Sequence, residues 1–167
     1  AVRVPWESCV TVGTQWGFKY DDTYKSTREL VHMLVQVVSR GGNLALNIGP
    51  QPNGELPANA LRELEGLGAW LRTNGEAIYA TRPADTVQIG DVYYTKKADA
   101  LYAIRLLDAD EVLTGTVVLP VDRPVKAVTC LSTGETPAFT QDTDGLHITL
   151  SGALSGVEHP AVAFRLD

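Results

Sequence analysis

A glutamate beside a tryptophan near the start of the chain is a candidate for acid–base chemistry. Glu7 follows Trp6, and a carboxylate that a neighbouring indole shields from water is suited to act as a general acid. The same carboxylate can equally act as a structural hydrogen-bond acceptor, because perturbed acids are often structural. Glu7 is therefore a candidate general acid/base, with the structural role left open.

The histidines and cysteines are not spaced as metal ligands. His32 falls in an apolar segment, and His147 and His159 lack cysteine or carboxylate partners at ligand spacing. Cys9 and Cys130 lie far apart, and we expect two buried free thiols, with a disulfide between them left open. No metal and no cofactor is expected.

Charge and hydropathy argue against two classes of partner. The net charge is -6 and the pI is near 5.0, with lysines and arginines scattered along the chain, so no basic surface attracts phosphates. No apolar run approaches the roughly 20 residues of a membrane span. We expect neither nucleic acid nor a membrane as a partner. The chain starts with neither Met nor a signal-peptide pattern, which predicts a piece cut from something longer.

The first half of the chain has the pattern of alternating strands and helices. Ser26 and Glu29 form a capping box that starts an apolar helix, and two glycines at 41–42 end it. The short apolar run at 43–50 is typical of a buried parallel strand, and residues 57–73 have helical spacing. An earlier strand is expected within 6–12. Two strands and two helices are too few to form a closed sheet by themselves.

The second half consists of short β-rich runs separated by turn residues. This texture is typical of an antiparallel sandwich. We therefore predict an α/β domain over residues 1–83 and an all-β domain over residues 84–167. The expected strands are 92–95, 101–107, 116–119, 125–131, 146–150 and 162–166.

Four segments of the first half resemble the α-L-fucosidase family, glycoside hydrolase family 29, in order and spacing. The two specific ones are a Gly-Gly-Asn strand ending in Asn-x-Gly-Pro at 41–50 and a helix ending in Asn-Gly-Glu-Ala-Ile-Tyr at 70–79. The other two are Trp-Glu-Ser-Cys at 6–9 and Gln-Trp-Gly-Phe at 15–18. The second half resembles the family's C-terminal β-sandwich more loosely, through 92–97 and 101–104.

The resemblance implies the terminal portion of a (β/α) TIM-like barrel followed by a C-terminal antiparallel β-sandwich. It implies a retaining exo-α-L-fucosidase, which hydrolyses terminal α-L-fucosyl linkages with two carboxyl groups about 5 Å apart. The family's nucleophilic aspartate, in a Trp-x-Asp-Gly-like strand motif, and its fucose-binding histidines precede the Trp-Glu motif, and this sequence contains neither feature. We therefore expect a C-terminal fragment of a glycoside hydrolase that is inactive by itself.

Two site residues carry over from the resemblance. Trp16 aligns with an aromatic position that lines the pocket for the fucose C6 methyl, and burying a methyl favours that sugar by about 1 kcal/mol. The other interpretation of Trp16 is a core or turn aromatic. Glu7 aligns with a carboxylate that is a general acid/base candidate in some members, whereas in others an acid further upstream has that role.

The resemblance also implies partners. These are a fucosylated glycan or oligosaccharide and an N-terminal barrel polypeptide, or a homo-oligomer, that covers the open sheet. The family leaves the compartment open among secreted, periplasmic and lysosomal-type locations. The alternative function is a carbohydrate-binding or structural β-sandwich module without activity, in which exposed aromatics stack on sugars. The available rings are Tyr93, Tyr94, Tyr102 and Phe139, most of which we expect in the core.

Overall fold

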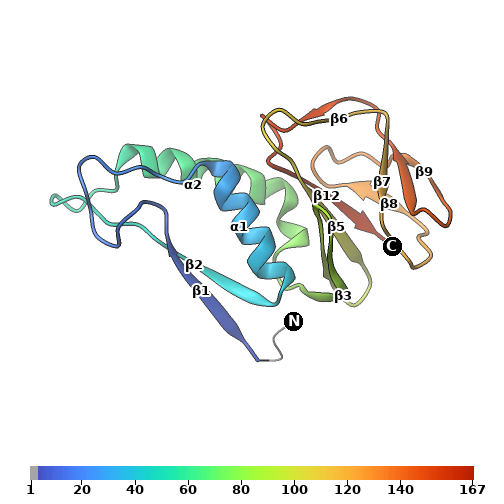
Figure 1. Ribbon diagram of the computed structural model, residues 1–167, viewed down its shortest axis with the longest axis horizontal. Coiled ribbons are helices and arrows are strands. Elements are labelled where there is room, and N and C mark those ends of the chain that lie inside the picture. The colour runs from blue at the N-terminus through green and yellow to red at the C-terminus, as the bar shows by residue number, and fades with distance from the viewer. Residues whose placement is uncertain (1–3) are drawn as a thin grey trace.

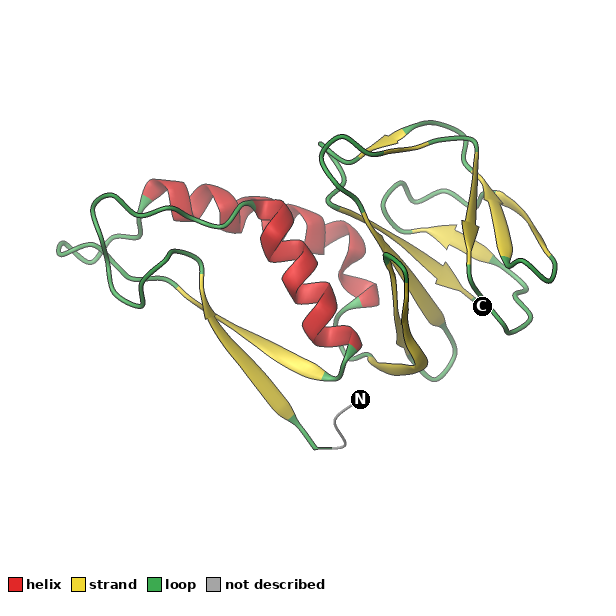
Figure 2. Cartoon of the chain, viewed as in Figure 1, coloured by secondary structure: helices red, strands yellow, loops and turns green. Residues whose placement is uncertain are grey.

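The computed structural model describes residues 4–167 as helices lying between two groups of strands (Figures 1 and 2). The elements of the first half are β1 (Trp6–Thr11), α1 (Thr27–Ser39), β2 (Gly42–Asn47), α2 (Ala58–Asn74) and the short 3-10 helix η1 (Gly75–Ala77). The strands that follow are β3 (Arg82–Ile89), β4 (Val92–Lys96), β5 (Leu101–Leu106), β6 (Val112–Leu113), β7 (Thr116–Leu119), β8 (Val128–Cys130), β9 (Ala138–Gln141), β10 (Leu146–Thr149), β11 (Leu154–Ser155) and β12 (Ala161–Leu166). An α/β start followed by antiparallel sheets is the predicted fold class, and it is confirmed.

β1 and β2 form a parallel pair whose register is set by a tryptophan lying over a glycine. Trp6 is the register partner of Gly42, and a Cβ added to Gly42 would come within 2.5 Å of Cζ2 of that indole. The indole Nε1 also donates to the carbonyl of Arg40 at 3.3 Å. Because only glycine leaves room for the ring, this contact ties the start of β1 to the turn between α1 and β2.

The two faces of the β1–β2 pair differ in polarity, since side chains alternate along a strand. Leu46 of β2 and Ile48, just beyond it, pack against the core that contains the helices. On the other face Glu7 and its register partner Asn43 are exposed. Cys9 shares that face and is a free, exposed thiol, so the expectation that it is buried was wrong. One face of the pair is thus open.

The capping box predicted for α1 is present. The backbone N–H of Glu29 donates to Oγ of Ser26 at 3.3 Å, and the backbone N–H of Ser26 donates to Oε2 of Glu29 at 2.8 Å. The backbone N–H and the hydroxyl of Ser26, which both donate to Oε2 of Glu29, hold the pKa of Glu29 below its usual range. Beyond the cap the apolar face buries Leu30, Val31 and Val35. Local signals therefore fix where α1 begins and which face it buries.

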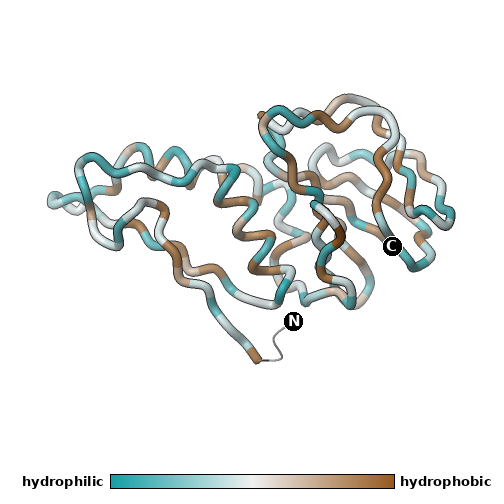
Figure 3. The backbone as a smooth tube through the Cα atoms, in the orientation of Figure 1, coloured by the Kyte–Doolittle hydropathy of each residue, from teal (hydrophilic) through white to brown (hydrophobic). Residues whose placement is uncertain are grey.

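The five-stranded antiparallel sheet, in the order β3-β4-β5-β12-β8, is covered on both faces. Tyr102 and Ile104 of β5 face the helices, in a core with α1 and α2. Ala103 of β5 and Phe164 of β12 face the smaller sheets, in a second core that includes β7 and β10. Hydrophobic stretches accordingly follow α1 and the strands beside it (Figure 3). The sheet is a middle layer shared by both halves.

A polar cluster at the end of α2 ties the helices to this sheet. Oε1 of Glu76 accepts hydrogen bonds from the hydroxyl of Tyr102 at 2.8 Å and from Nη1 of Arg165 at 2.6 Å. The Tyr102 hydroxyl and, after it, the Arg165 guanidinium hold the pKa of Glu76 below its usual range. Oδ1 of Asn74 accepts from Ser132 Oγ at 2.8 Å. The Asn-Gly-Glu motif at 74–76 thus joins α2 to β5 and β12.

Two further observations complete the description. Cys130 is buried and free, as expected. No helix within residues 4–167 combines the length and the apolarity that crossing a membrane requires.

Replacing the glycine under the indole tests the register contact. We expect Gly42→Ala to lower the free energy of unfolding by about 1–3 kcal/mol, because the added methyl forces the ring of Trp6 out of its place. Urea denaturation measures this. The control is Gly152→Ala, at a glycine whose added Cβ meets nothing within 4 Å. Equal stability of the two variants would contradict the contact.

Candidate functional site

The loops that follow β1 and β2 meet at the carboxyl ends of the two parallel strands. The backbone N–H of Val12 donates to the carbonyl of Asn47 at 2.9 Å, and Nδ2 of Asn47 donates to the carbonyl of Trp16 at 2.8 Å. A Cβ on Gly49 would lie 2.4 Å from the backbone nitrogen of Phe18, so the first loop lies directly on the second. Carboxyl ends of parallel strands are where α/β folds place their binding sites.

An aspartate that sequence reasoning missed holds the first loop in shape. Asp22 accepts hydrogen bonds from the backbone N–H groups of Thr14 at 3.1 Å and Thr23 at 3.0 Å, and from the Thr14 hydroxyl. That hydroxyl contributes most to holding the pKa of Asp22 below its usual range. A Cβ on Gly13 would come within 3.0 Å of Cγ of Asp22. With these bonds Asp22 acts as an ionised brace.

A lysine closes the same loop from its other end. Nζ of Lys25 donates to the carbonyls of Thr11 at 2.7 Å and Gly13 at 3.3 Å, and its backbone N–H donates to the carbonyl of Val12 at 2.8 Å. The ammonium group therefore sits at the carboxyl end of β1. The only sequence signal for it was its place just before the capping box.

Trp16 lies in this loop with most of its ring in solvent. The residue is 58% exposed, while its backbone carbonyl is held by the hydrogen bond from Asn47. Two more aromatic residues follow it: the rings of Phe18 and Tyr20 pack edge to face, 5.0 Å apart and at 72°. An exposed ring on a fixed backbone suits the apolar face of a ligand.

Glu7 lies at the other end of β1. It is the second residue of the strand, exposed and opposite Asn43. Thr11 is four positions further along β1, which at about 3.3 Å per residue is roughly 13 Å along the strand. The structure therefore does not bring Glu7 and Trp16 together. Glu7 is also the one carboxylate in the two strands β1 and β2.

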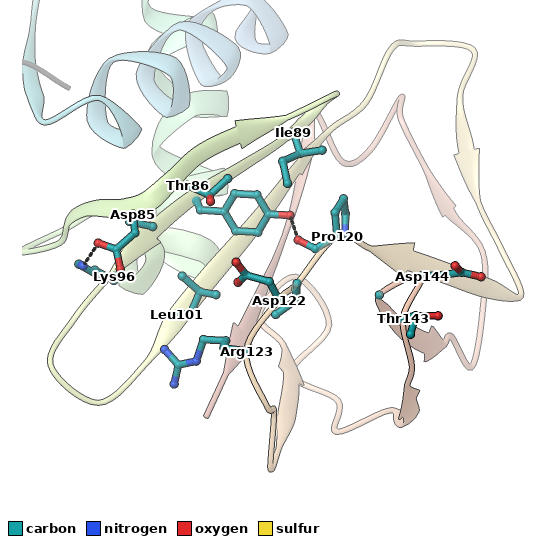
Figure 4. Close-up of a pocket in the computed structure, with 14 residues that line it drawn as sticks. Asp85, Thr86, Ile89, Lys96, Leu101, Pro120, Asp122, Arg123, Thr143 and Asp144 are labelled. Atoms are coloured by element: carbon teal, nitrogen blue, oxygen red, sulfur yellow. Dashed lines mark hydrogen bonds and ion pairs between the residues drawn. The ribbon is translucent and has the colours of Figure 1, made fainter.

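A separate pocket of about 370 Å³ opens in the β-rich half (Figure 4). Asp85, paired with Lys96 at 2.7 Å, and Asp122 stand around it. Tyr94 lies within its wall and donates to the carbonyl of Pro120 at 2.5 Å. The ring of Tyr94 is 2% exposed, and burial raises its pKa to about 12. Because the ring of Tyr94 is buried, it cannot stack on a sugar.

The other rings considered as sugar platforms are also covered. Tyr93 is 6% exposed and Tyr102 is fully buried, while Phe139 is partly buried against the sandwich core. Most of these rings are core residues, as expected, and Phe139 is half-buried at the edge of the core. Within residues 4–167 no cluster of three or more His, Cys, Asp or Glu side chains is placed to hold a metal ion.

Comparison with known proteins links this arrangement to one family. A family model described as Alpha-L-fucosidase matches residues 1–76. The Alpha-L-fucosidase of Branchiostoma floridae is 40% identical over 134 residues, which are 75% of this chain and 29% of that protein. Plasma alpha-L-fucosidase of Rattus norvegicus is 41% identical over 110 residues, 60% of this chain and 24% of that protein.

Solved structures agree over nearly the whole chain. Alpha-L-fucosidase isoenzyme 1 from Paenibacillus thiaminolyticus superposes with a TM-score of 0.84 and 30% identity, over 98% of this chain and 39% of that one. The Thermotoga maritima alpha-fucosidase in complex with fucose gives 0.83 and 27%, over 99% of this chain and 40% of that one. This chain therefore spans less than half the length of the proteins it matches. On sequence and fold together, the chain belongs to the α-L-fucosidase family, glycoside hydrolase family 29, of which it spans a part.

Proposed function

We propose that the chain is the C-terminal part of a retaining exo-α-L-fucosidase, which hydrolyses terminal α-L-fucosyl linkages in glycans. The observation that carries this proposal is the match of 99% of the chain to 40% of a fucosidase solved with fucose. We assign residues 1–83 to the C-terminal portion of the catalytic barrel and residues 84–167 to a C-terminal β-sandwich. The chemistry of the whole enzyme then belongs to an assembly larger than this chain.

The β1–β2 pair supports the incomplete-barrel interpretation. These strands form a sheet of two, paired only with each other among residues 4–167, and one face of it carries exposed Glu7, Cys9 and Asn43. Open edges and an uncovered face invite pairing with further strands. The proposed partner is the upstream barrel polypeptide, or a second copy of this chain where that polypeptide is missing.

A retaining reaction needs a nucleophile and an acid/base from two carboxyl groups. The related family 29 enzyme from Bacteroides thetaiotaomicron has been trapped as a covalent intermediate with 2-fluoro-fucosyl fluoride in a glutamate-to-glutamine variant, which supports the same route here. Strands β1 and β2 supply one carboxylate, Glu7. We therefore place the nucleophile in the upstream polypeptide.

Within this assembly the two candidate residues have different tasks. Trp16, exposed at the strand ends, is proposed to cover the C6 methyl of fucose. Glu7 is proposed as general acid/base because it is the carboxylate of β1 on the open face. It lies roughly 13 Å along the strand from Thr11, so the two roles are alternatives for one fucose: Glu7 acts only if the sugar binds at its end of β1, away from Trp16. The β-sandwich is proposed as a brace, supported by the bonds of Glu76 to Tyr102 and Arg165.

The isolated chain is expected to lack fucosidase activity. Purified chain and an aryl α-L-fucoside should give no turnover above the uncatalysed rate, because the reaction needs two carboxyl groups and the nucleophile is proposed to lie in the upstream polypeptide. Adding the upstream barrel polypeptide should restore turnover and form a stable complex on size-exclusion chromatography. Turnover by the chain alone would overturn the fragment proposal, and persistent inactivity without association would count against the proposed partner.

In the reconstituted enzyme, Trp16→Ala should lower kcat/KM for the aryl α-L-fucoside by about five- to tenfold, because the methyl loses its apolar cover. Discrimination against the matching α-L-galactoside, which carries a hydroxymethyl group instead, should shrink by a similar factor. Tyr79→Ala is the control, since Tyr79 is a 61% exposed aromatic elsewhere on the chain. Unchanged discrimination in Trp16→Ala would show that Trp16 does not contact the C6 methyl of fucose.

In the same enzyme, Glu7→Gln should slow hydrolysis of substrates with poor leaving groups by about 100-fold or more, because protonation of the leaving oxygen is lost. The limb of the pH profile that reports the acid should disappear with it. Substrates with activated leaving groups should suffer less. A rate within about twofold of wild type on both substrate types would leave Glu7 as a solvent-facing strand residue.

A further inference from the structure

We propose that Tyr20 and Phe18 form the aromatic wall of a second saccharide subsite, which binds the leaving-group sugar of the glycan. This inference rests on the proposed function, because it concerns the sugar attached to fucose at the same strand ends. The subsite is a shallow groove between the two loops after β1 and β2. Its walls include Phe18, Tyr20 and Tyr24 from the first loop and Gln51, Pro57 and Asn59 from the second loop and the start of α2.

The aromatic side of the groove is open to solvent. Tyr20 is 85% exposed, the highest value among the large hydrophobic residues that reach the surface. Its ring is nonetheless held in place by the edge-to-face contact with Phe18, 5.0 Å between centroids. An exposed ring in a fixed orientation presents a flat apolar face together with a hydroxyl, and this combination suits the C–H face and hydroxyls of a pyranose.

The opposite side of the groove supplies hydrogen-bonding groups. Asn59 is exposed at the start of α2, so its amide offers both donors and an acceptor. Nε2 of Gln51 donates weakly to the carbonyl of Leu56 at 3.4 Å, which leaves its oxygen as an acceptor. Rings on one wall and amides on the other match the mixed chemistry of a sugar better than that of a purely apolar ligand.

The position of the groove favours the leaving-group sugar. Phe18 follows Trp16 by two residues, so their Cα atoms are at most about 7 Å apart. Contact of Gly49 with the backbone at 17–18 fixes this part of the first loop against the loop after β2. In the proposed arrangement the fucose contacts Trp16 and the next sugar lies over Phe18 and Tyr20, whose ring packs on that of Phe18. Asp22 also lines the groove, but its oxygens are bonded to Thr14 and the adjacent backbone.

A fucose-free monosaccharide tests the subsite directly. We expect methyl β-D-galactopyranoside or N-acetyl-D-glucosamine to shift the NMR signals of Tyr20, Gln51 and Asn59 in the full chain, saturably at millimolar sugar. Tyr20→Ala should weaken this binding by about two- to tenfold, the range of an aromatic contact. Tyr79→Ala removes another exposed tyrosine, 61% accessible, and should leave binding unchanged. Absence of saturable shifts, or equal binding by Tyr20→Ala, would overturn the inference.

A kinetic comparison in the reconstituted enzyme separates this inference from the proposed function. Tyr20→Ala should lower kcat/KM for a fucosylated disaccharide by about two- to tenfold and leave kcat/KM for an aryl fucoside with a small leaving group unchanged. An active enzyme in which both substrates respond equally would refute the subsite and leave the fucosidase proposal standing. A reconstituted wild-type enzyme that is inactive on both substrates, with monosaccharide binding intact, would refute the fucosidase proposal and leave a sugar-binding groove that is not a leaving-group subsite.

Discussion

Burial of the five-stranded sheet on both faces is the constraint on which both halves of this chain depend. Along β5, Tyr102 and Ile104 turn toward the helices, while Ala103 turns toward the smaller sheets. Such a sheet cannot lose either cover without exposing a layer of apolar side chains to water. The helices and the sandwich therefore stabilise each other through one shared layer, and Glu76 adds a charged link between them.

This shared layer also determines where the β1–β2 pair lies. α1 packs on one side against the sheet through the core containing Tyr102, and on its other side it contacts β2. Trp6 over Gly42 then fixes the register of β1 against β2. The strand ends, and with them the loops carrying Trp16 and Tyr20, are therefore positioned by a chain of packing contacts that starts in the β-rich half.

In the loop after β1, some side chains hold the backbone in shape and others remain exposed to solvent. Asp22 and Lys25 use their charges on backbone N–H and carbonyl groups, which holds the loop without secondary structure. Trp16 and Tyr20 remain largely in solvent, at 58% and 85%. Leaving large rings exposed on a braced loop makes sense where a ligand covers them. In a sugar-binding interpretation the brace limits the entropy lost on binding.

Much of this fold was determined by local sequence signals. The capping box at Ser26 and Glu29, the apolar face of α1, the alternation in 43–48 and the β-rich second half all specify structure through neighbours in sequence, whose spacing is readable directly. The motifs at 41–50 and 70–79 likewise identified the family. Only the tertiary structure decided that Cys9 lies exposed, that Glu7 lies at the end of β1 away from the loop carrying Trp16, and that Asp22 and Lys25 hold that loop. These properties depend on strand register and on which face of a sheet is covered, and contacts between residues far apart in sequence set both.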